Sequence, residues 1–219
     1  MLIRLPGVYP PQEDTWLLAD IVAQQDLRAH SRVLDICTGT GALAVRAAQT
    51  GAGHVTALDI SRRAFTTAWL NSRIRGHRIR VLRGDLVNPV RDERFDLVIS
   101  NPPYVPAHND ALPATGIARA WDAGKDGRAL LDRICRQAPE VLDQGGTLLL
   151  AQSALSGVEK TQTMLEEQGL EVDVMCRQEI PFGPVMTARR AMLENRGLID
   201  AGQRSEELVV IRAVNHSFG

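Results

Sequence analysis

Residues 32–41 read Arg-Val-Leu-Asp-Ile-Cys-Thr-Gly-Thr-Gly, and this stretch decides the fold. Its first half, residues 32–36, is apolar enough to predict a buried parallel strand. Gly39 and Gly41 then let the backbone turn tightly and approach a ligand closely, at the start of a helix predicted over 41–50. The amides at that helix start would point at whatever ligand lies there. A strand, a glycine loop and a helix in this order are typical of an open α/β sheet that binds its ligand at the turn.

The same alternation continues along the chain. Apolar runs predict further strands at 54–60, 79–82, 95–100, 145–151, 170–174 and 207–212. Apolar residues at helical spacing predict helices at 16–22, 62–74, 127–142, 158–168 and 186–195. Strands that alternate with helices predict an α/β fold with a seven-stranded, mostly parallel, doubly wound sheet. The last two strands are separated by only a short helical stretch, so we expect them to form an antiparallel hairpin.

Length and composition set further bounds. The chain has 219 residues, 44% hydrophobic and 23% charged, which predicts one well-cored domain over 1–219. Within it, 1–30 is a lead-in followed by a helix, and 181–204 is an insertion before the last strand. The net charge of −1 gives no global positive field that would favour nucleic acid. The three cysteines are too widely spaced to indicate a disulfide framework or a zinc site.

The sequence shows no secretory signal or membrane anchor. The N-terminus lacks the apolar core of a signal peptide, and no run of 18 apolar residues occurs. We therefore expect a cytoplasmic location and no membrane partner.

Acidic residues follow or end the first three predicted strands. Asp35 precedes the glycines, Asp59 lies 24 residues further on, and Asp85 follows the third strand. Asp59 can bind the two hydroxyls of a ribose, as in NAD enzymes. The pattern Gly39-x-Gly41-x-x-Ala44 also fits NAD enzymes, so alone it decides little. Asp35 can meet an ammonium group and Asp85 an adenine amino group. NAD has no cation near that turn, so the set favours S-adenosylmethionine (SAM). The neighbouring Cys37, Ile60 and Leu86 are counted with this cofactor site.

Asn101-Pro102-Pro103-Tyr104 follows the fourth predicted strand, where the ligand crevice of such a sheet opens. The prolines stiffen the loop and remove two N–H donors, which leaves its carbonyls free to accept hydrogen bonds. The Asn101 side-chain oxygen and the Pro102 carbonyl can hold an –NH2 group, while Tyr104 stacks on the planar group that carries it. The stretch predicts a binding site for a planar amine or amide nitrogen.

This stretch resembles the motif of SAM-dependent methyltransferases that act on nitrogen attached to a planar group. The chain resembles their class I, Rossmann-like fold over nearly its whole length. Residues 8–15, Val-Tyr-Pro-Pro-Gln-Glu-Asp-Thr, are similar to the lead-in of the short branch of the HemK/PrmC family. That resemblance implies that Thr15 reaches the cofactor. Pro106 and the stretch 121–128 are also typical of HemK-type enzymes.

The resemblance implies an activity and partners. HemK/PrmC enzymes transfer a methyl group from SAM to a glutamine side chain of a peptide-chain release factor and leave S-adenosylhomocysteine. The bacterial enzymes carry an N-terminal helical domain that grips the release factor, and this chain begins almost directly at the catalytic domain. Substrate choice would then come from the loop 105–126, the insertion 181–204 or a partner. The short eukaryotic enzymes use a small zinc-binding activator subunit.

Three alternatives remain. Residues 73–83 contain five arginines and His77, which could meet the phosphates of RNA or DNA and bring an adenine or guanine amino group to the pocket. The chain could instead bind SAM without catalysis, although such a protein would have no use for a nitrogen site. Methylation of a protein lysine would need a base, for which Asp14 and Asp122 are weak candidates.

The helix at 186–195 is expected to expose Arg189, Arg190 and Arg196, as a lid or as a surface insertion.

Overall fold

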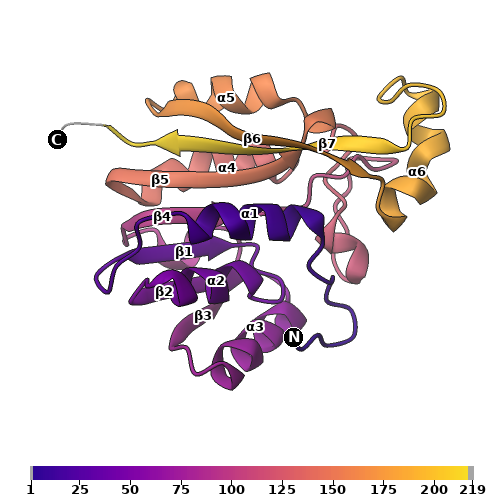
Figure 1. Ribbon diagram of the computed structural model, residues 1–219. Coiled ribbons are helices and arrows are strands. Elements are labelled where there is room, and N and C mark those ends of the chain that lie inside the picture. Colours follow the sequence, from indigo (N-terminus) through magenta and orange to yellow (C-terminus); the bar gives the residue numbers. More distant parts are fainter. Residues whose placement is uncertain (1, 217–219) are drawn as a thin grey trace.

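The computed structural model describes residues 2–216 and contains one seven-stranded sheet (Figure 1). The strands are β1 (Arg32–Ile36), β2 (His54–Asp59), β3 (Ile79–Arg83), β4 (Phe95–Ser100), β5 (Leu142–Ser153), β6 (Glu171–Pro181) and β7 (Ser205–Val214). The helices are α1 (Glu13–Ala23), α2 (Ala42–Thr50), α3 (Arg62–Ile74), α4 (Leu131–Gln137), α5 (Val158–Glu166) and α6 (Pro184–Asn195).

The strand order is β3-β2-β1-β4-β5-β7-β6. The first five strands pair in parallel, and β7 runs antiparallel between β5 and β6. The predicted α/β fold and its antiparallel hairpin are therefore confirmed. Because β7 is reversed, its first residues lie at the edge where the parallel strands end. The largest differences from the predicted boundaries are in β6, which continues to Pro181, and in the helix predicted over 127–142. That helix is only α4, Leu131–Gln137, followed by a 3-10 turn at Ala138–Val141, because the glycine-rich segment before it forms turns and β5 already begins at Leu142.

Helices cover both faces of the sheet and bury two apolar clusters. On one face α1 packs against α2, and Leu18, Val22 and Leu43 are buried there against the sheet. On the other face α4 packs against α5, and Leu131 and Leu165 are buried. The apolar run that predicted β1 is explained by this burial, because both of its faces are covered.

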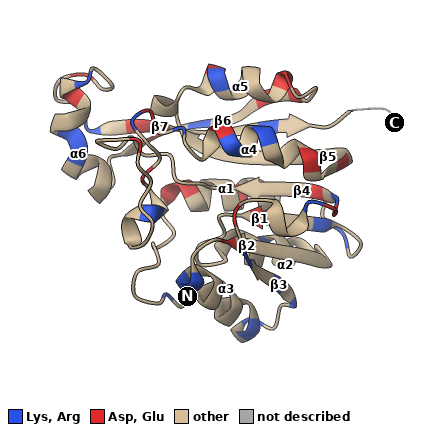
Figure 2. Ribbon diagram, turned by 180° about the vertical axis from the view of Figure 1, so that it is seen from behind, with Lys and Arg blue, Asp and Glu red and all other residues tan. Residues whose placement is uncertain are grey.

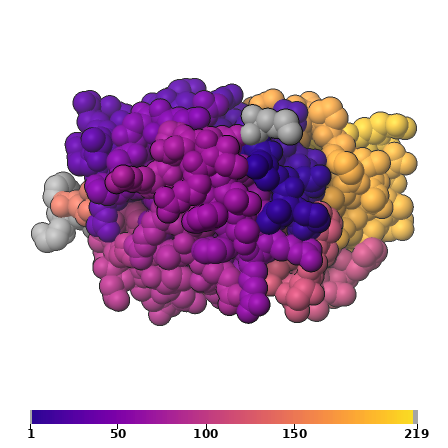
Figure 3. All heavy atoms as spheres, turned by 90° about the horizontal axis from the view of Figure 1, so that it is seen from below, coloured from indigo at the N-terminus to yellow at the C-terminus, as the bar shows by residue number. Residues whose placement is uncertain are grey.

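The lead-in and α6 lie at the ligand end of the sheet. Figure 3 shows the first residues between the part of the chain around residue 75 and the α6 region. The Asn71 side chain fixes this lead-in to α3, because its Oδ1 accepts from the Ile3 amide and its Nδ2 donates to the Ile3 carbonyl, both at 2.8 Å.

The helix α6 does not simply project from the surface. Arg189 donates to the Pro106 carbonyl at 2.9 Å and pairs with Asp122, and its side chain is only 16% exposed. Arg196 donates to the carbonyls of Ala107 at 3.1 Å and Lys125 at 2.8 Å. The expectation that Arg189 is exposed is therefore wrong, because α6 packs its guanidinium against the loop 105–126.

No helix within residues 2–216 is long and apolar enough to cross a membrane.

Candidate functional site

One cavity of about 710 Å³ opens at the carboxyl ends of the parallel strands. Most of the residues predicted for the site line it, namely Thr15, Cys37, Gly39, Asp59, Ile60, Asp85, Leu86, Asn101, Pro102, Pro103 and Tyr104. The structure thus brings together four loops and the start of α1. Asp35 and Gly41 are the two predicted residues that do not line the cavity, and both lie directly behind its wall.

The glycine loop is joined to the end of β2. The Gly39 amide donates to one oxygen of Asp59 at 2.9 Å, and the Ser61 amide donates to the other at 2.8 Å. Burial raises the pKa of the Asp59 carboxyl, and these two bonds oppose the rise. Asp59 is therefore held in one orientation at the cavity wall, with acceptor capacity left over for a ligand hydroxyl.

Asp35 is fully buried beneath the loop. Its Oδ2 accepts from Thr38 Oγ1 at 2.5 Å and from the Ala44 amide at 3.0 Å, whereas its Oδ1 has no partner in the described part of the chain. Burial raises the pKa of Asp35 to about 7. The unpartnered oxygen lies behind the glycine loop that lines the cavity, so the predicted contact between Asp35 and a cationic group of the ligand stays a prediction.

Cys37 adopts a strained backbone conformation. Its φ of +61° lies in the left-handed region, which residues other than glycine rarely adopt. Burial raises the pKa of its thiol, and Asp59 raises it further, so this cysteine is held as the neutral thiol. Leu86, at the far side of the cavity, is the other residue besides the glycines with positive φ within 2–216. Strained backbone of this kind is concentrated at functional sites.

Asp85 has a partner that the sequence analysis missed. Arg133 of α4 donates to its Oδ2 at 2.6 Å, and both side chains line the cavity. The pair fixes the Asp85 carboxyl at the end of β3, where the other oxygen can accept from an adenine amino group.

A chain of hydrogen bonds connects the Asn101 loop to α1. Asn101 Nδ2 donates to Thr15 Oγ1 at 3.2 Å, and Thr15 Oγ1 donates to Asp14 Oδ1 at 3.2 Å. The hydroxyl of Tyr104 donates to Asp14 Oδ2 at 2.8 Å. Asn101 Oδ1 has no partner in the described part of the chain. The amide of Asn101 is therefore oriented through its nitrogen, and its oxygen is left for a ligand.

Ser156 and the glycine-rich stretch 121–128 support the Asn101 loop from behind. Ser156 Oγ donates to the Tyr104 carbonyl at 2.9 Å. Gly127 has φ +73°, and a Cβ there would lie 2.4 Å from the Tyr104 carbonyl oxygen. The stretch also pairs with the chain after Tyr104, through bonds between Val105 and the backbone at Trp121 and Ala123. Only glycine allows the two segments to approach this closely.

Asp14, Arg133 and Glu206 are among the cavity residues that the predicted site did not include. Asp14 was considered only as a base for lysine. Glu206 is the second residue of β7, so it begins its strand and does not fit the pattern of polar residues at the carboxyl ends of parallel strands. The signal was the predicted antiparallel hairpin, because a reversed strand begins where its parallel neighbours end.

These residues fit SAM. The methionine end of that molecule carries an ammonium group, and Asp35 places a carboxyl with an unpartnered oxygen directly behind the glycine loop of this wall. Its ribose and adenine offer hydroxyls and an amino group, for which Asp59 and Asp85 line the same wall. The positive φ of Gly41 and the 3.1 Å distance that a Cβ there would have to Ala68 explain why the loop needs glycine.

Comparisons with known proteins place the chain in a family. Residues 2–179 match the methyltransferase small domain. A protein of Methanocaldococcus jannaschii, provisionally named a protein N5-glutamine methyltransferase, is 34% identical over 83% of this chain and 90% of its own length. The release factor glutamine methyltransferase of Bordetella pertussis is 37% identical over 80% of this chain and 67% of its own. Methyltransferase HEMK2 of Mus musculus is 30% identical over 78% and 84%.

A solved structure has the same fold. The Encephalitozoon cuniculi Mtq2–Trm112 complex, which methylates the termination factor eRF1, contains a chain that superposes with a TM-score of 0.66 over 95% of this chain and 99% of its own, at 24% identity. The matching sequences, the fold and the cavity all indicate the same family. The chain therefore belongs to the methyltransferase small domain family, and within it to the SAM-dependent methyltransferases of the HemK/PrmC type.

Proposed function

We propose that this protein methylates the side-chain amide nitrogen of a glutamine in a polypeptide, with a peptide-chain release factor as the first candidate acceptor. One observation carries the proposal: Asn101 Oδ1 is an unpartnered acceptor in the cavity wall, on a proline-stiffened loop beside Tyr104. The names of two relatives, a protein N5-glutamine methyltransferase and a release factor glutamine methyltransferase, support the same acceptor. We also propose that residues 1–219 form a single methyltransferase domain and that the protein is located in the cytoplasm.

The reaction depends more on the positioning of the acceptor nitrogen than on a strong base. An amide nitrogen is a poor nucleophile because its lone pair is delocalised into the carbonyl. Asn101 Oδ1 and the Pro102 carbonyl would accept its two hydrogens, orient the nitrogen and stabilise positive charge as it develops. SAM supplies the methyl group as a sulfonium when bound. Thr15 and Asp14 keep the Asn101 amide in the required orientation, and Tyr104 contributes a flat surface for the amide plane.

The cofactor wall is proposed to consist of Thr15, Cys37, Gly39, Asp59, Ile60, Asp85, Leu86 and Asn101, with Asp35 and Gly41 supporting it from behind. A small activator subunit remains a proposed partner, because Mtq2 was solved as a complex with Trm112.

Methylation of nucleic acid is less well supported. Within the arginine-rich stretch 73–83, Arg80 pairs with Glu93 at 2.8 Å and Arg73 lies over the Trp69 ring, 5.7 Å from its centroid. Basic and acidic residues are interspersed over the helices and strands rather than separated (Figure 2).

The test is transfer of labelled methyl groups from SAM to purified release factors, total RNA and genomic DNA, each with wild type and Asn101→Ala. The proposal expects label on a glutamine of a release factor, located by mass spectrometry of peptides, and its loss in the variant. Label on nucleic acid alone would replace the proposed acceptor while leaving the nitrogen site intact. Labelling of the release factor by Asn101→Ala at the wild-type rate would remove Asn101 from the chemistry.

A further inference from the structure

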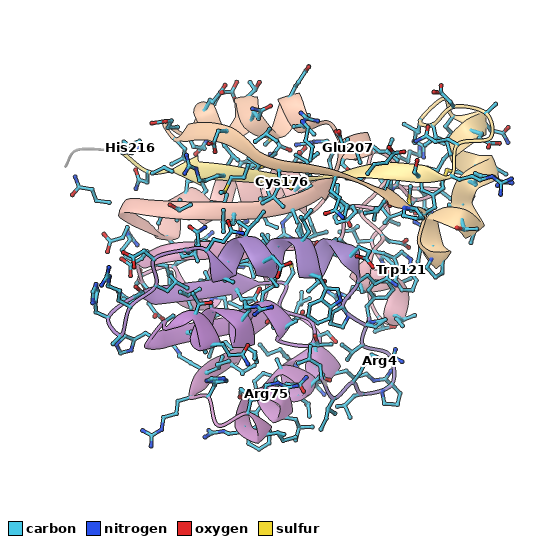
Figure 4. The ribbon with its side chains drawn as sticks, viewed as in Figure 1. Arg4, Arg75, Trp121, Cys176, Glu207 and His216 are labelled. Carbon is cyan, nitrogen blue, oxygen red and sulfur yellow. The ribbon has the colours of Figure 1, made fainter. Side chains whose placement is uncertain are left out.

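Glu206 is a cavity residue for which the proposed reaction has no role. It lines the cavity from the start of β7, yet only 6% of the residue is exposed. It lies beyond β4 and β5 from the cofactor loops, so it belongs to the acceptor half of the cavity. Figure 4 shows its neighbour Glu207 labelled on β7, near the end of the strand that meets α6.

One oxygen of this carboxyl is unsatisfied. Glu206 Oε2 is one of four buried side-chain oxygens within residues 2–216 that have no hydrogen-bond partner. Asn101 Oδ1 is another, and these two are the members of that group that line the cavity. Leaving a buried polar group unpaired is costly, so an unpaired carboxylate oxygen in a binding cavity indicates a ligand that supplies a donor.

The surroundings of Glu206 are acidic. Burial raises the pKa of its carboxyl, a hydrogen bond with Ser153 opposes the rise, and the nearby Asp14 adds to it. Burial raises the pKa values of Tyr104 and Tyr9, and the nearby Asp14 and Glu206 add to both rises. This wall therefore favours a ligand that brings N–H groups or positive charge.

Asp14 and Glu206 differ in whether the protein itself satisfies their oxygens. Asp14 accepts from the Thr15 amide, the Thr15 hydroxyl and the Tyr104 hydroxyl, so it is satisfied within the protein. Glu206 is not, although it is the more buried of the two.

We infer that Glu206 is a specificity residue that accepts a hydrogen bond from an N–H group of the acceptor polypeptide, beside the residue whose nitrogen occupies the Asn101 site. The inference rests on the proposed function and adds to it a second contact with the substrate. The donor is either a backbone amide or a Lys or Arg side chain next to the methylated position, since both offer an N–H to a carboxylate.

Glu206→Gln tests the inference, because it preserves the shape of the side chain and removes its charge. The matched control is Glu207→Gln, which removes the next carboxyl along the strand; Glu207 pairs with Arg177 at 2.5 Å outside the cavity. Steady-state kinetics with a labelled release factor should show KM for the acceptor raised ~10- to 100-fold in Glu206→Gln, the range for a hydrogen bond to a charged group. The dissociation constant for SAM, measured by calorimetry, should stay within about twofold of wild type.

A second measurement excludes a merely structural role. Because Glu206 is buried with an unpartnered oxygen, Glu206→Gln should melt at the wild-type temperature or above it. An acceptor whose neighbouring Lys and Arg residues are neutralised identifies the donor. The KM of this neutralised acceptor is compared between wild type and Glu206→Gln. If wild type already shows a raised KM and Glu206→Gln gives no further increase, the donor is a basic side chain. If Glu206→Gln still raises the KM, the donor is the backbone.

An unchanged KM for the acceptor in Glu206→Gln, or an increase accompanied by a lower melting temperature, would overturn the inference. Failure of the wild-type protein to label any polypeptide is a different result, since it would overturn the proposed function together with the occupant assigned here.

Discussion

Asn101 is the residue on which the chemistry is expected to depend. Replacement by Ala removes the oxygen that orients the acceptor nitrogen, and the loss of one such contact in other enzymes costs ~3–4 kcal/mol of transition-state stabilisation. We expect turnover to fall roughly 100-fold or more, while the affinity for SAM weakens only modestly. Single-turnover rates and calorimetric titration with SAM measure the two effects. Asn109→Ala, on the exposed part of the loop 105–126, is the control and should leave both unchanged.

Cys37 allows a test of backbone strain. Its left-handed conformation favours glycine, so Cys37→Gly should change the free energy of unfolding by less than about 1 kcal/mol, because relief of strain offsets the entropy cost of glycine. Cys37→Val should lower it by about 1–3 kcal/mol, since a β-branched residue is poorly tolerated at positive φ. Denaturant titration of the three proteins decides. Equal stability of the Val variant and wild type would contradict this explanation.

Gly127 is predicted to matter through the Tyr104 carbonyl. A Cβ at this position would lie 2.4 Å from that oxygen and 2.7 Å from Ser156 Oγ, so Gly127→Ala should displace the Asn101 loop and lower both turnover and stability, the latter by about 1–3 kcal/mol. Gly145→Ala is the control, because Gly145 has nearly the same φ, +72°, and nothing within 4 Å of its Cβ position. The control should keep wild-type turnover despite the same backbone strain.

At the scale of the element, α6 is expected to order the loop 105–126. Arg189 connects this helix to both ends of the loop, at Pro106 and Asp122. Arg189→Met keeps the length of the side chain and removes the donors, so residues 108–120 should exchange their amide hydrogens faster and KM for the acceptor should rise. Arg190→Met is the control, because Arg190 pairs with Glu194 inside α6. Equal exchange in the two variants would mean that α6 does not hold the loop.

At the scale of the whole molecule, stability should fall as pH rises from about 4 to 7. Asp35, Asp59 and Glu206 all have folded-state pKa values raised above their ordinary ones, mainly by burial. In that range the folded state binds more protons than the unfolded state, so the free energy of unfolding decreases as pH rises. The contribution of Asp35 levels off above about 7, its folded pKa.

Asp35→Asn isolates one contribution to this pH dependence. Relative to wild type, the variant should gain stability as pH rises from 4 to 7, by roughly 1–4 kcal/mol, because the asparagine needs no proton to stay neutral. Urea titrations at several pH values, without cofactor, measure the difference. A constant difference between the two proteins across this range would show that Asp35 does not titrate as proposed.

The sequence by itself determined the α/β order of the chain, the parallel sheet with its antiparallel last pair of strands, and the loops that bear Gly39, Asp59, Asp85 and Asn101. It could do so because periodicity, glycine and proline act locally, and because the ends of parallel strands must meet at one edge of a sheet. The roles of these residues stay predictions until they are tested.

Only the tertiary structure decided which groups support the site. Asp14 reaches Tyr104 across 90 residues, Arg133 reaches Asp85 across 48, and Arg189 closes on Asp122 across 67. No local pattern encodes such contacts, since each depends on how distant elements pack. The same holds for Glu206, which enters the cavity because β7 is reversed, and for Asp35, which the fold places behind the wall that its sequence position suggested it would line.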